Sequence, residues 1–291
     1  MLIFSAYKGS TIVARSSASI TVLGSGDTLG TPLMGSKTAA NLDDDPKSRR
    51  FRFGLLLRLG GVTILVDPNP DLKWQCLQST FELKEIDHVL ITHHHADHTN
   101  GMGEFFYRRK QPTKVWYTDH PFNHNHMDYW RYLEREQVLH FATHKNYQAF
   151  KLSSDISVMP VALSHGHPAS GYVIYYQGKK IAIVTDTNAA LPAKTLRELG
   201  GADVLFADSF SEDMDQVAEL YAEIGLDGSY AHSRPWYHMT ISDAMELRRS
   251  TGAGILYPIH MSRFMAPHRE LVQKYECDEV RIPWDGMQIL M

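Results

Sequence analysis

The chain has few cysteines and no long apolar run, and each shortage excludes a class of protein. Only two cysteines, Cys76 and Cys277, occur in 291 residues, and they lie far apart. This argues against a disulfide framework and a thiolate zinc site, and it fits a reducing compartment. No apolar run approaches the ~18 residues of a membrane span. We therefore expect a cytoplasmic protein with no membrane partner.

Basic residues are also fewer than acidic ones, with 29 lysines and arginines against 33 aspartates and glutamates. The formal net charge is −4, whereas a protein that binds duplex nucleic acid usually has a basic balance. A local basic stretch that includes Arg49 and Arg50 is still compatible with a small anionic ligand. We expect a small phosphorylated substrate and no duplex nucleic acid. The oligomeric state stays open between a monomer and a homodimer.

The length allows one large domain or two small ones, and no internal repeat or low-complexity tract divides the chain. We expect an N-terminal extension over residues 1–18 and a single domain over residues 19–291. The extension contains Lys8 and Arg15 but no acidic residue. It is interpreted as an extra strand or a ragged end, with an organellar targeting segment as the alternative.

Short apolar runs bounded by Gly, Pro, Asp and Asn predict two series of strands. The first is Ser19–Leu23, Phe53–Leu57, Thr63–Val66, His88–Ile91 and Lys114–Tyr117, and the second is Ile156–Val161, Gly171–Tyr176, Lys180–Val184, Val204–Ala207, Ile255–Pro258 and Gln288–Leu290. Helical patterns cover Asp71–Leu83, Pro121–Glu136, Pro192–Leu199, Glu212–Ile224, Ser242–Thr251 and Pro267–Tyr275. The order favours two sheets packed face to face and covered by helices, although composition alone also permits a doubly wound sheet.

Histidine is abundant, with 16 in the chain, and four of them follow one apolar strand in the segment Thr92-His93-His94-His95-Ala96-Asp97-His98. His93 and His95 alternate on one side, so both imidazoles can bind one cation. Asp97 and His98 come at the following turn and can reach a second cation. Imidazole and carboxylate ligands suit zinc, manganese or iron. A purification tag would lie at a terminus and would not contain an aspartate.

This His-x-His-x-Asp-His segment resembles the signature of the metallo-β-lactamase superfamily. The resemblance implies an α/β fold, an αββα sandwich of two mixed β-sheets flanked by helices. It also implies three further ligands at strand ends, which His165, Asp186 and His260 can supply. His165 is favoured because of its distance from the strand that begins at Gly171, and His167 is the alternative.

The implied centre holds two divalent metal ions, zinc or manganese. His93, His95 and His165 would bind one ion, and Asp97, His98 and His260 the other, with Asp186 between them. Two such ions activate a water at neutral pH. Asp97 would also orient that water, and Asp67 would fix the tautomer of an imidazole.

A His-x-Thr element, His238-Met239-Thr240, resembles the phosphodiesterase branch of the superfamily. In that branch the histidine protonates the leaving oxygen or stabilises the charged phosphorane, and it binds no metal. His238 is thus a candidate catalytic acid, paired with Asp208, and Thr240 is also a candidate helix cap. Five further cations or imidazoles are candidates for holding phosphate or ribose: Arg49, Arg50, His232, Arg234 and Arg263.

The likeness is greatest to the phosphoribosyl 1,2-cyclic phosphate phosphodiesterases, from about Ser19 to Met291. It includes Gly24-Ser25-Gly26, Gly30-Thr31-Pro32 and Asp285-Gly286-Met287. That family often has a cysteine-rich zinc site after Gly30-Thr31-Pro32, and here the loop has no cysteine. The resemblance implies a metal-dependent hydrolase of a small, cyclic phosphodiester. The alternatives are a lactone or thioester hydrolase and a cofactor-biosynthesis accessory protein.

Two loops carry further hypotheses. Gly24–Asn41 is rich in glycine, and its amides could face an anion, although tight turns also explain it. The segment Asp119–Met127 contains His120, His124 and His126. A solvated loop is the simpler interpretation, and a wall of the substrate mouth is the alternative.

Overall fold

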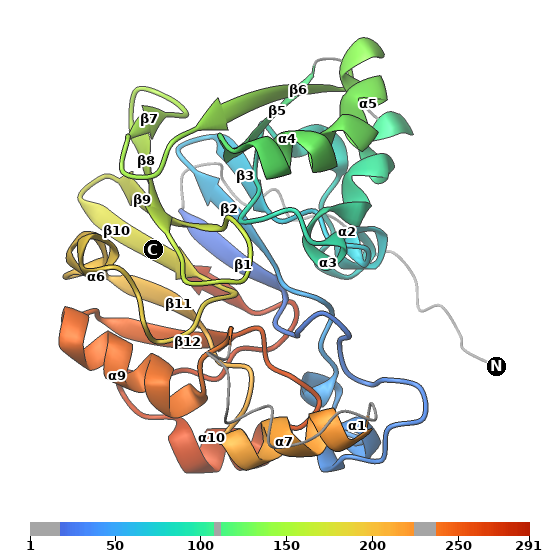
Figure 1. The fold of residues 1–291 in the computed structure, drawn as a ribbon, viewed down its shortest axis with the longest axis vertical. Helices are drawn as coiled ribbons and strands as arrows, with labels where there is room; N and C mark the ends of the chain where they lie inside the picture. Colours follow the sequence, from blue (N-terminus) through green and yellow to red (C-terminus); the bar gives the residue numbers. More distant parts are fainter. Residues whose placement is uncertain (1–17, 108–111, 224–236) are drawn as a thin grey trace.

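A computed structural model describes residues 18–107, 112–223 and 237–291. Within these ranges the chain forms two mixed β-sheets that pack face to face between two layers of helices (Figure 1). The expected αββα sandwich is therefore confirmed, and a doubly wound sheet is excluded. The first strand begins at Ser19, and residues 1–17 lie outside the described ranges.

The first sheet has seven strands in the order β13-β1-β2-β3-β4-β5-β6. Strands β3 to β6 run parallel, and the other pairs are antiparallel. The bounds are β1 Ser19–Gly24, β2 Gly54–Leu59, β3 Val62–Val66, β4 His88–Leu90, β5 Thr113–Thr118, β6 Leu139–His144 and β13 Gln288–Leu290.

The second sheet has six strands in the order β12-β11-β10-β9-β8-β7, and only β10, β11 and β12 run parallel. The bounds are β7 Phe150–Lys151, β8 Ile156–Ala162, β9 Ser170–Tyr176, β10 Lys179–Val184, β11 Val204–Asp208 and β12 Ile255–Ile259. The two strands that the apolar runs did not predict are β6 and β7. β6 contains two histidines and a threonine, and β7 has only two residues.

Helices cover the outer faces of both sheets (Figure 1). Those beside the first sheet are α2 Leu72–Ser79, α3 Ala96–Thr99, α4 Pro121–Met127 and α5 Arg131–Arg135; α6 Ala193–Leu199 and α9 Ile241–Thr251 cover the second, and α1 Ala39–Leu42, α7 Met214–Glu223 and α10 His268–Tyr275 lie near one end. The single helix expected over Pro121–Glu136 is wrong, because a 3₁₀ turn at Asp128–Trp130 separates α4 from α5. The helix expected to reach Leu83 ends earlier, where Thr80 takes a left-handed conformation (φ 53°).

Alternation along the strands divides the apolar side chains among three cores. Leu55 and Leu57 face the second sheet, whereas Leu56 between them faces the helices. In the second sheet, Ile183 points toward the first sheet and Ala182 points toward α6 and α9. Burial on both faces explains why these strands are continuous apolar runs.

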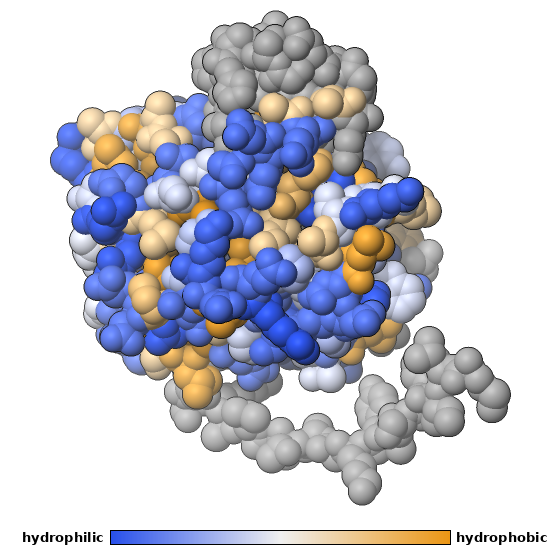
Figure 2. Space-filling model, turned by 90° about the horizontal axis from the view of Figure 1, so that it is seen from below, coloured by the Kyte–Doolittle hydropathy of each residue, from blue (hydrophilic) through white to orange (hydrophobic). Residues whose placement is uncertain are grey.

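On the face seen from below, hydrophilic residues cover most of the described surface, with hydrophobic residues in small groups (Figure 2). Among the described residues, no helix is long and apolar enough to cross a membrane.

Candidate metal centre

The histidines and aspartates named from the sequence lie where strands of both sheets end. Asp67 follows β3, Asp186 follows β10, and His260 follows β12. All three have a left-handed backbone conformation, with φ of 55°, 53° and 60°. Non-glycine residues adopt that conformation at a cost, and such strain concentrates at functional sites. The sharp turn after each strand directs these side chains toward one point.

One histidine group comes from the loops after β4 and β8. The ligand atoms of His93, His95 and His165 all lie within 4.8 Å of one another. His93 Nε2 is 3.0 Å from His95 Nδ1, and His165 Nε2 is 3.5 Å from the same atom. The structure thus brings together the three histidines expected to share one cation. His167 is in none of the described groups with metal-ligand spacing, and its ring lies 5.0 Å from that of His95.

A second group lies beside the first and contains Asp97, His98 and His260, again within 4.8 Å. Asp97 and His98 lie on the short helix α3, which begins directly after the histidine run. His98 Nε2 is 3.1 Å from an Asp97 carboxylate oxygen. These are the three residues expected to bind the second cation.

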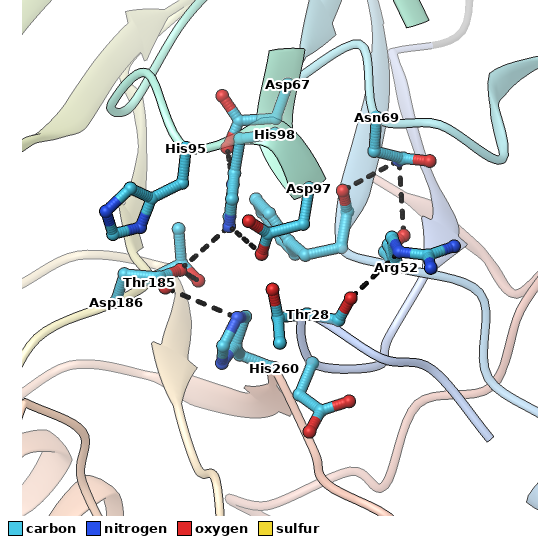
Figure 3. Close-up of polar contacts among 12 residues, drawn as sticks. Thr28, Arg52, Asp67, Asn69, His95, Asp97, His98, Thr185, Asp186 and His260 are labelled. Atoms are coloured by element: carbon cyan, nitrogen blue, oxygen red, sulfur yellow. Dashed lines mark hydrogen bonds and ion pairs between the residues drawn. The ribbon is translucent and has the colours of Figure 1, made fainter. Parts of the chain in front are cut away.

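Asp186 contacts both groups, and Figure 3 shows it beside His98 and His260 of the second. One carboxylate oxygen is 3.9 Å from His93 Nε2 and 3.3 Å from His260 Nε2, and the other is 3.3 Å from His98 Nε2. The carboxylate therefore faces both groups at once. This is the position that a bridging ligand would take.

The donor set fits divalent metal ions. Both ring nitrogens of His260 and Nδ1 of His165 are buried and form no hydrogen bond within the described protein. Buried polar atoms normally have a partner, so these nitrogens need one. Imidazole nitrogens with two carboxylates suit zinc, manganese or iron. The residues present therefore fit a metal-binding site.

Asp67 fixes the orientation of the His98 ring. Its Oδ2 is 2.7 Å from His98 Nδ1, which turns Nε2 toward Asp97 and Asp186. The same carboxylate accepts hydrogen bonds from the backbone N–H and the hydroxyl of Thr92, next to His93. Asp67 thus supports the loop that carries most of the cluster, as metal-ligating histidines usually require.

The surrounding charges favour a protonated ring at His98 and a neutral ring at His93. Burial disfavours a charged imidazole at His98, but the carboxylates of Asp186 and Asp97 outweigh it and raise its pKa well above the usual value. Burial lowers the pKa of His93 well below its usual value, and the neighbouring His98 lowers it further. A site that stabilises positive charge at one point and keeps a neighbouring imidazole neutral favours binding of a cation.

His238 adjoins the cluster and is paired with Asp208. The fully buried Asp208 carboxylate lies 2.8 Å from His238 Nδ1. Burial would lower the pKa of His238, but the charge of Asp208 and its hydrogen bond raise it to about 8. The His238 ring is stacked 4.9 Å from that of His260, and its ligand atoms also form a group with Asp186 and His260. The pair with Asp208 therefore favours a protonated His238 ring, which faces the candidate centre.

The candidate phosphate-binding residues do not all gather there. Arg50 and Arg263 are buried, with 2% and 3% of their surface exposed, whereas Arg49 is exposed. His232 and Arg234 lie outside the described residues. Sequence reasoning missed the buried Asp27, whose charge acts on both His260 and His238. The one signal in the sequence that could have indicated Asp27 is its position in the glycine-rich loop Gly24–Asn41.

The hypothesis of an anion cradle in Gly24–Asn41 is wrong for the first part of that loop. The amide of Gly26 donates to Phe51 O, and that of Asp27 donates to Met261 O. Asp27 Oδ1 accepts the amides of Leu29 and Gly30. These donors are used within the protein, so no anion can take them without breaking the loop.

A single side chain closes the cysteine-free part of the same loop. The Asn41 carboxamide accepts from the Leu33 amide at 2.5 Å and donates to Leu33 O at 3.1 Å and to Ser36 O at 2.9 Å. The Asn41 side chain therefore connects the two ends of this loop segment. The segment has no cysteine that could bind a metal in its place.

Comparison with known proteins identifies the superfamily. Residues 62–261 match the β-lactamase superfamily domain. The chain belongs to that superfamily. Its expected identification as a metallo-β-lactamase-fold protein is therefore confirmed.

Curated relatives match the chain only over part of their own length. An octanoyltransferase of Porphyromonas gingivalis is 24% identical over 278 residues, which are 93% of this chain and 51% of that protein. A ribonuclease Z of Methanopyrus kandleri is 32% identical over 57 residues, 20% of each chain. The chain thus spans about half the length of the first relative and a fifth of the second.

Similar solved structures cover nearly the whole chain. A diphosphatase of the PhnP family has a TM-score of 0.75 at 23% identity, covering 94% of this chain and 97% of that one. Zinc-bound PqqB from Methylobacterium extorquens has a TM-score of 0.75 at 17% identity, covering 93% and 99%. These likenesses show the shared fold.

Proposed function

We propose that the protein is a metal-dependent hydrolase of a small phosphodiester, with a cyclic diester as the first expectation. The observation that carries the proposal is the His238–Asp208 pair beside the histidine–aspartate cluster. An imidazole with a pKa raised to about 8 is protonated at neutral pH and can donate that proton. Hydrolysis that expels a stable anion, such as a thiolate or a phenolate, has less need of such an acid.

The chain's own residues supply the rest of the site. His93, His95 and His165 would hold one divalent ion, Asp97, His98 and His260 a second, and Asp186 would contact both. Zinc or manganese bound there would supply Lewis acidity toward a phosphoryl oxygen and hydroxide at neutral pH. Asp67 keeps His98 oriented, and Asp97 can orient the attacking water as well as bind.

His238 would then give its Nε2 proton to the leaving oxygen, because Asp208 holds Nδ1. Asp208 stabilises the protonated ring and holds its orientation through the contact with Nδ1. The named activities of two similar proteins, a diphosphatase and a ribonuclease, both concern phosphate bonds and support this choice.

The test compares substrates that differ in leaving group. Metal content and kcat are measured on the same sample with bis(p-nitrophenyl) phosphate, a 2′,3′-cyclic nucleotide, a lactone and a thioester. We expect His238→Ala to keep its metal and to lose about 10²–10⁴-fold in kcat on the cyclic nucleotide. The loss should be smaller with p-nitrophenolate, which leaves without a proton.

Two results would contradict the proposal. Turnover of the lactone or thioester alone would assign a different hydrolase activity. Loss of metal in His238→Ala would make His238 a ligand, an arrangement that its distance to Asp186 and His260 also allows.

A further inference from the structure

Helix α4 places aromatic rings beside the candidate metal centre. The Phe122 ring lies 4.2 Å from that of His94, edge to face, and 4.7 Å from that of His126. The His126 ring in turn is stacked on His94 at 4.0 Å. His124 points away from these rings toward Tyr117 and Asp119. The segment interpreted as a solvated loop is therefore mostly a helix, and one side of it faces the histidine run.

Phe122 also contacts the loop after β8, which Figure 1 shows beside α4. The Phe122 and His167 rings are stacked almost parallel, with centroids 4.9 Å apart and planes 8° apart. The exposed His167 lies 5.0 Å from His95, ring to ring. Packing against Phe122 therefore holds His167 at the edge of the first histidine group without making it a member.

Tyr237 lies against the same loop. A Cβ at Gly166 would be 3.1 Å from the Tyr237 ring, so the ring rests on the backbone between His165 and His167. Its centroid is 5.7 Å from that of His165, and 45% of the residue is exposed. The Tyr237 ring therefore packs on the loop of His165 and is still accessible to a ligand.

We define the aromatic rim as Phe122, His167 and Tyr237. Its members flank the histidine group formed by His93, His95 and His165. Within the described residues, no lysine or arginine side chain lies over the ring of Phe122 or Tyr237. The rim therefore offers aromatic ring surfaces next to the candidate centre.

We propose that the aromatic rim binds a planar ring of the substrate, so that the substrate is a nucleoside phosphodiester and not a simple sugar phosphodiester. This inference rests on the proposed function and narrows its substrate class. Base–aromatic stacking tolerates any base, because every base has a π-face. The rim should therefore distinguish a nucleoside from a sugar and discriminate little between bases.

The test uses two substrates with the same scissile group. Adenosine 2′,3′-cyclic phosphate and methyl riboside 2,3-cyclic phosphate differ only in the group on C1′, which is a base in the first and a methoxy group in the second. We expect kcat/KM to favour the nucleotide by at least about tenfold in the metal-loaded protein. In Tyr237→Leu and Phe122→Leu that preference should fall by about tenfold, mostly through KM. Tyr129→Leu is the matched control, because Tyr129 is 72% exposed and lies outside the rim.

The outcomes separate the two proposals. Equal kcat/KM for both substrates, or a preference that survives in both rim variants, overturns the rim proposal and leaves the phosphodiesterase proposal standing. Failure to hydrolyse either substrate overturns the phosphodiesterase proposal. The rim is then judged by calorimetry with adenosine 5′-monophosphate and ribose 5-phosphate, where equal affinity overturns it and tighter nucleotide binding, lost in Tyr237→Leu, supports it.

Discussion

The Asp208→Asn substitution gives the sharpest test of how His238 acts. Asparagine can still accept the Thr187 amide that Asp208 Oδ2 now accepts at 3.1 Å, so the loop should keep its shape. The substitution removes the carboxylate charge and with it the strongest influence that raises the pKa of His238. Burial, the largest influence overall, then acts with less opposition and should take that pKa to 6.5 or below.

The size of the effect follows from the two pKa values. A pKa of about 8 leaves His238 roughly 90% protonated at pH 7, and a value of 6.5 or below leaves about a quarter or less. The change of about 1.5 units is worth about 2 kcal/mol of interaction between Asp208 and the protonated ring. The direction of the effect follows from the raised pKa. A raised pKa keeps His238 protonated at neutral pH, and when the pKa is lowered, the protonated form is lost first at the alkaline end of the pH range.

The assay is the pH profile of kcat for a cyclic nucleotide, with metal content checked at each pH. In the unmodified protein the alkaline limb should begin near pH 8. In Asp208→Asn it should move down by at least about one unit, so that activity recovers toward pH 6. An unchanged alkaline limb would refute the role of Asp208, and an identical shift on a p-nitrophenyl substrate would show that His238 is not the acid.

Further predictions concern metal affinity, packing and acid stability. Asp67→Asn should weaken metal binding about 10–100-fold in a metal titration, whereas Asp71→Asn, which breaks the ion pair with Arg52, should not. Gly101→Ala should lower the free energy of unfolding by about 3 kcal/mol in denaturant, because a Cβ would lie 2.1 Å from Asn69 O. Gly103→Ala is the control, because the nearest contact of its Cβ would be Trp130 at 3.6 Å. Equal stability of the two variants would contradict this packing argument. Burial lowers the pKa of His144 to about 3, so the unfolded chain binds the extra proton and stability falls as pH drops from 6.5 toward 3. At pH 5 this effect lowers the free energy of unfolding by about 2 kcal/mol. In denaturant unfolding, the His144→Gln variant should not show this part of the stability loss at acid pH.

Some features of the site follow from local sequence. The run from His93 to His98 begins shortly after the apolar strand β4, and the i, i+2 spacing of His93 and His95 puts both on one side where the chain is extended. The strand-end positions of Asp186 and His260 were also readable, because each comes directly after an apolar run. These inferences hold because a side chain's direction within one element depends only on the period of that element.

Only the tertiary structure decided which of these side chains meet. His165 reaches His93 and His95 across about 70 residues of sequence, and His167 does not, because its ring is stacked on Phe122 from α4. The amides of the glycine-rich loop looked free in the sequence but are used by Phe51 and Met261, which are distant in the chain. Such pairings arise when two sheets and their helices bury their apolar faces together, and no local spacing encodes the distance between elements.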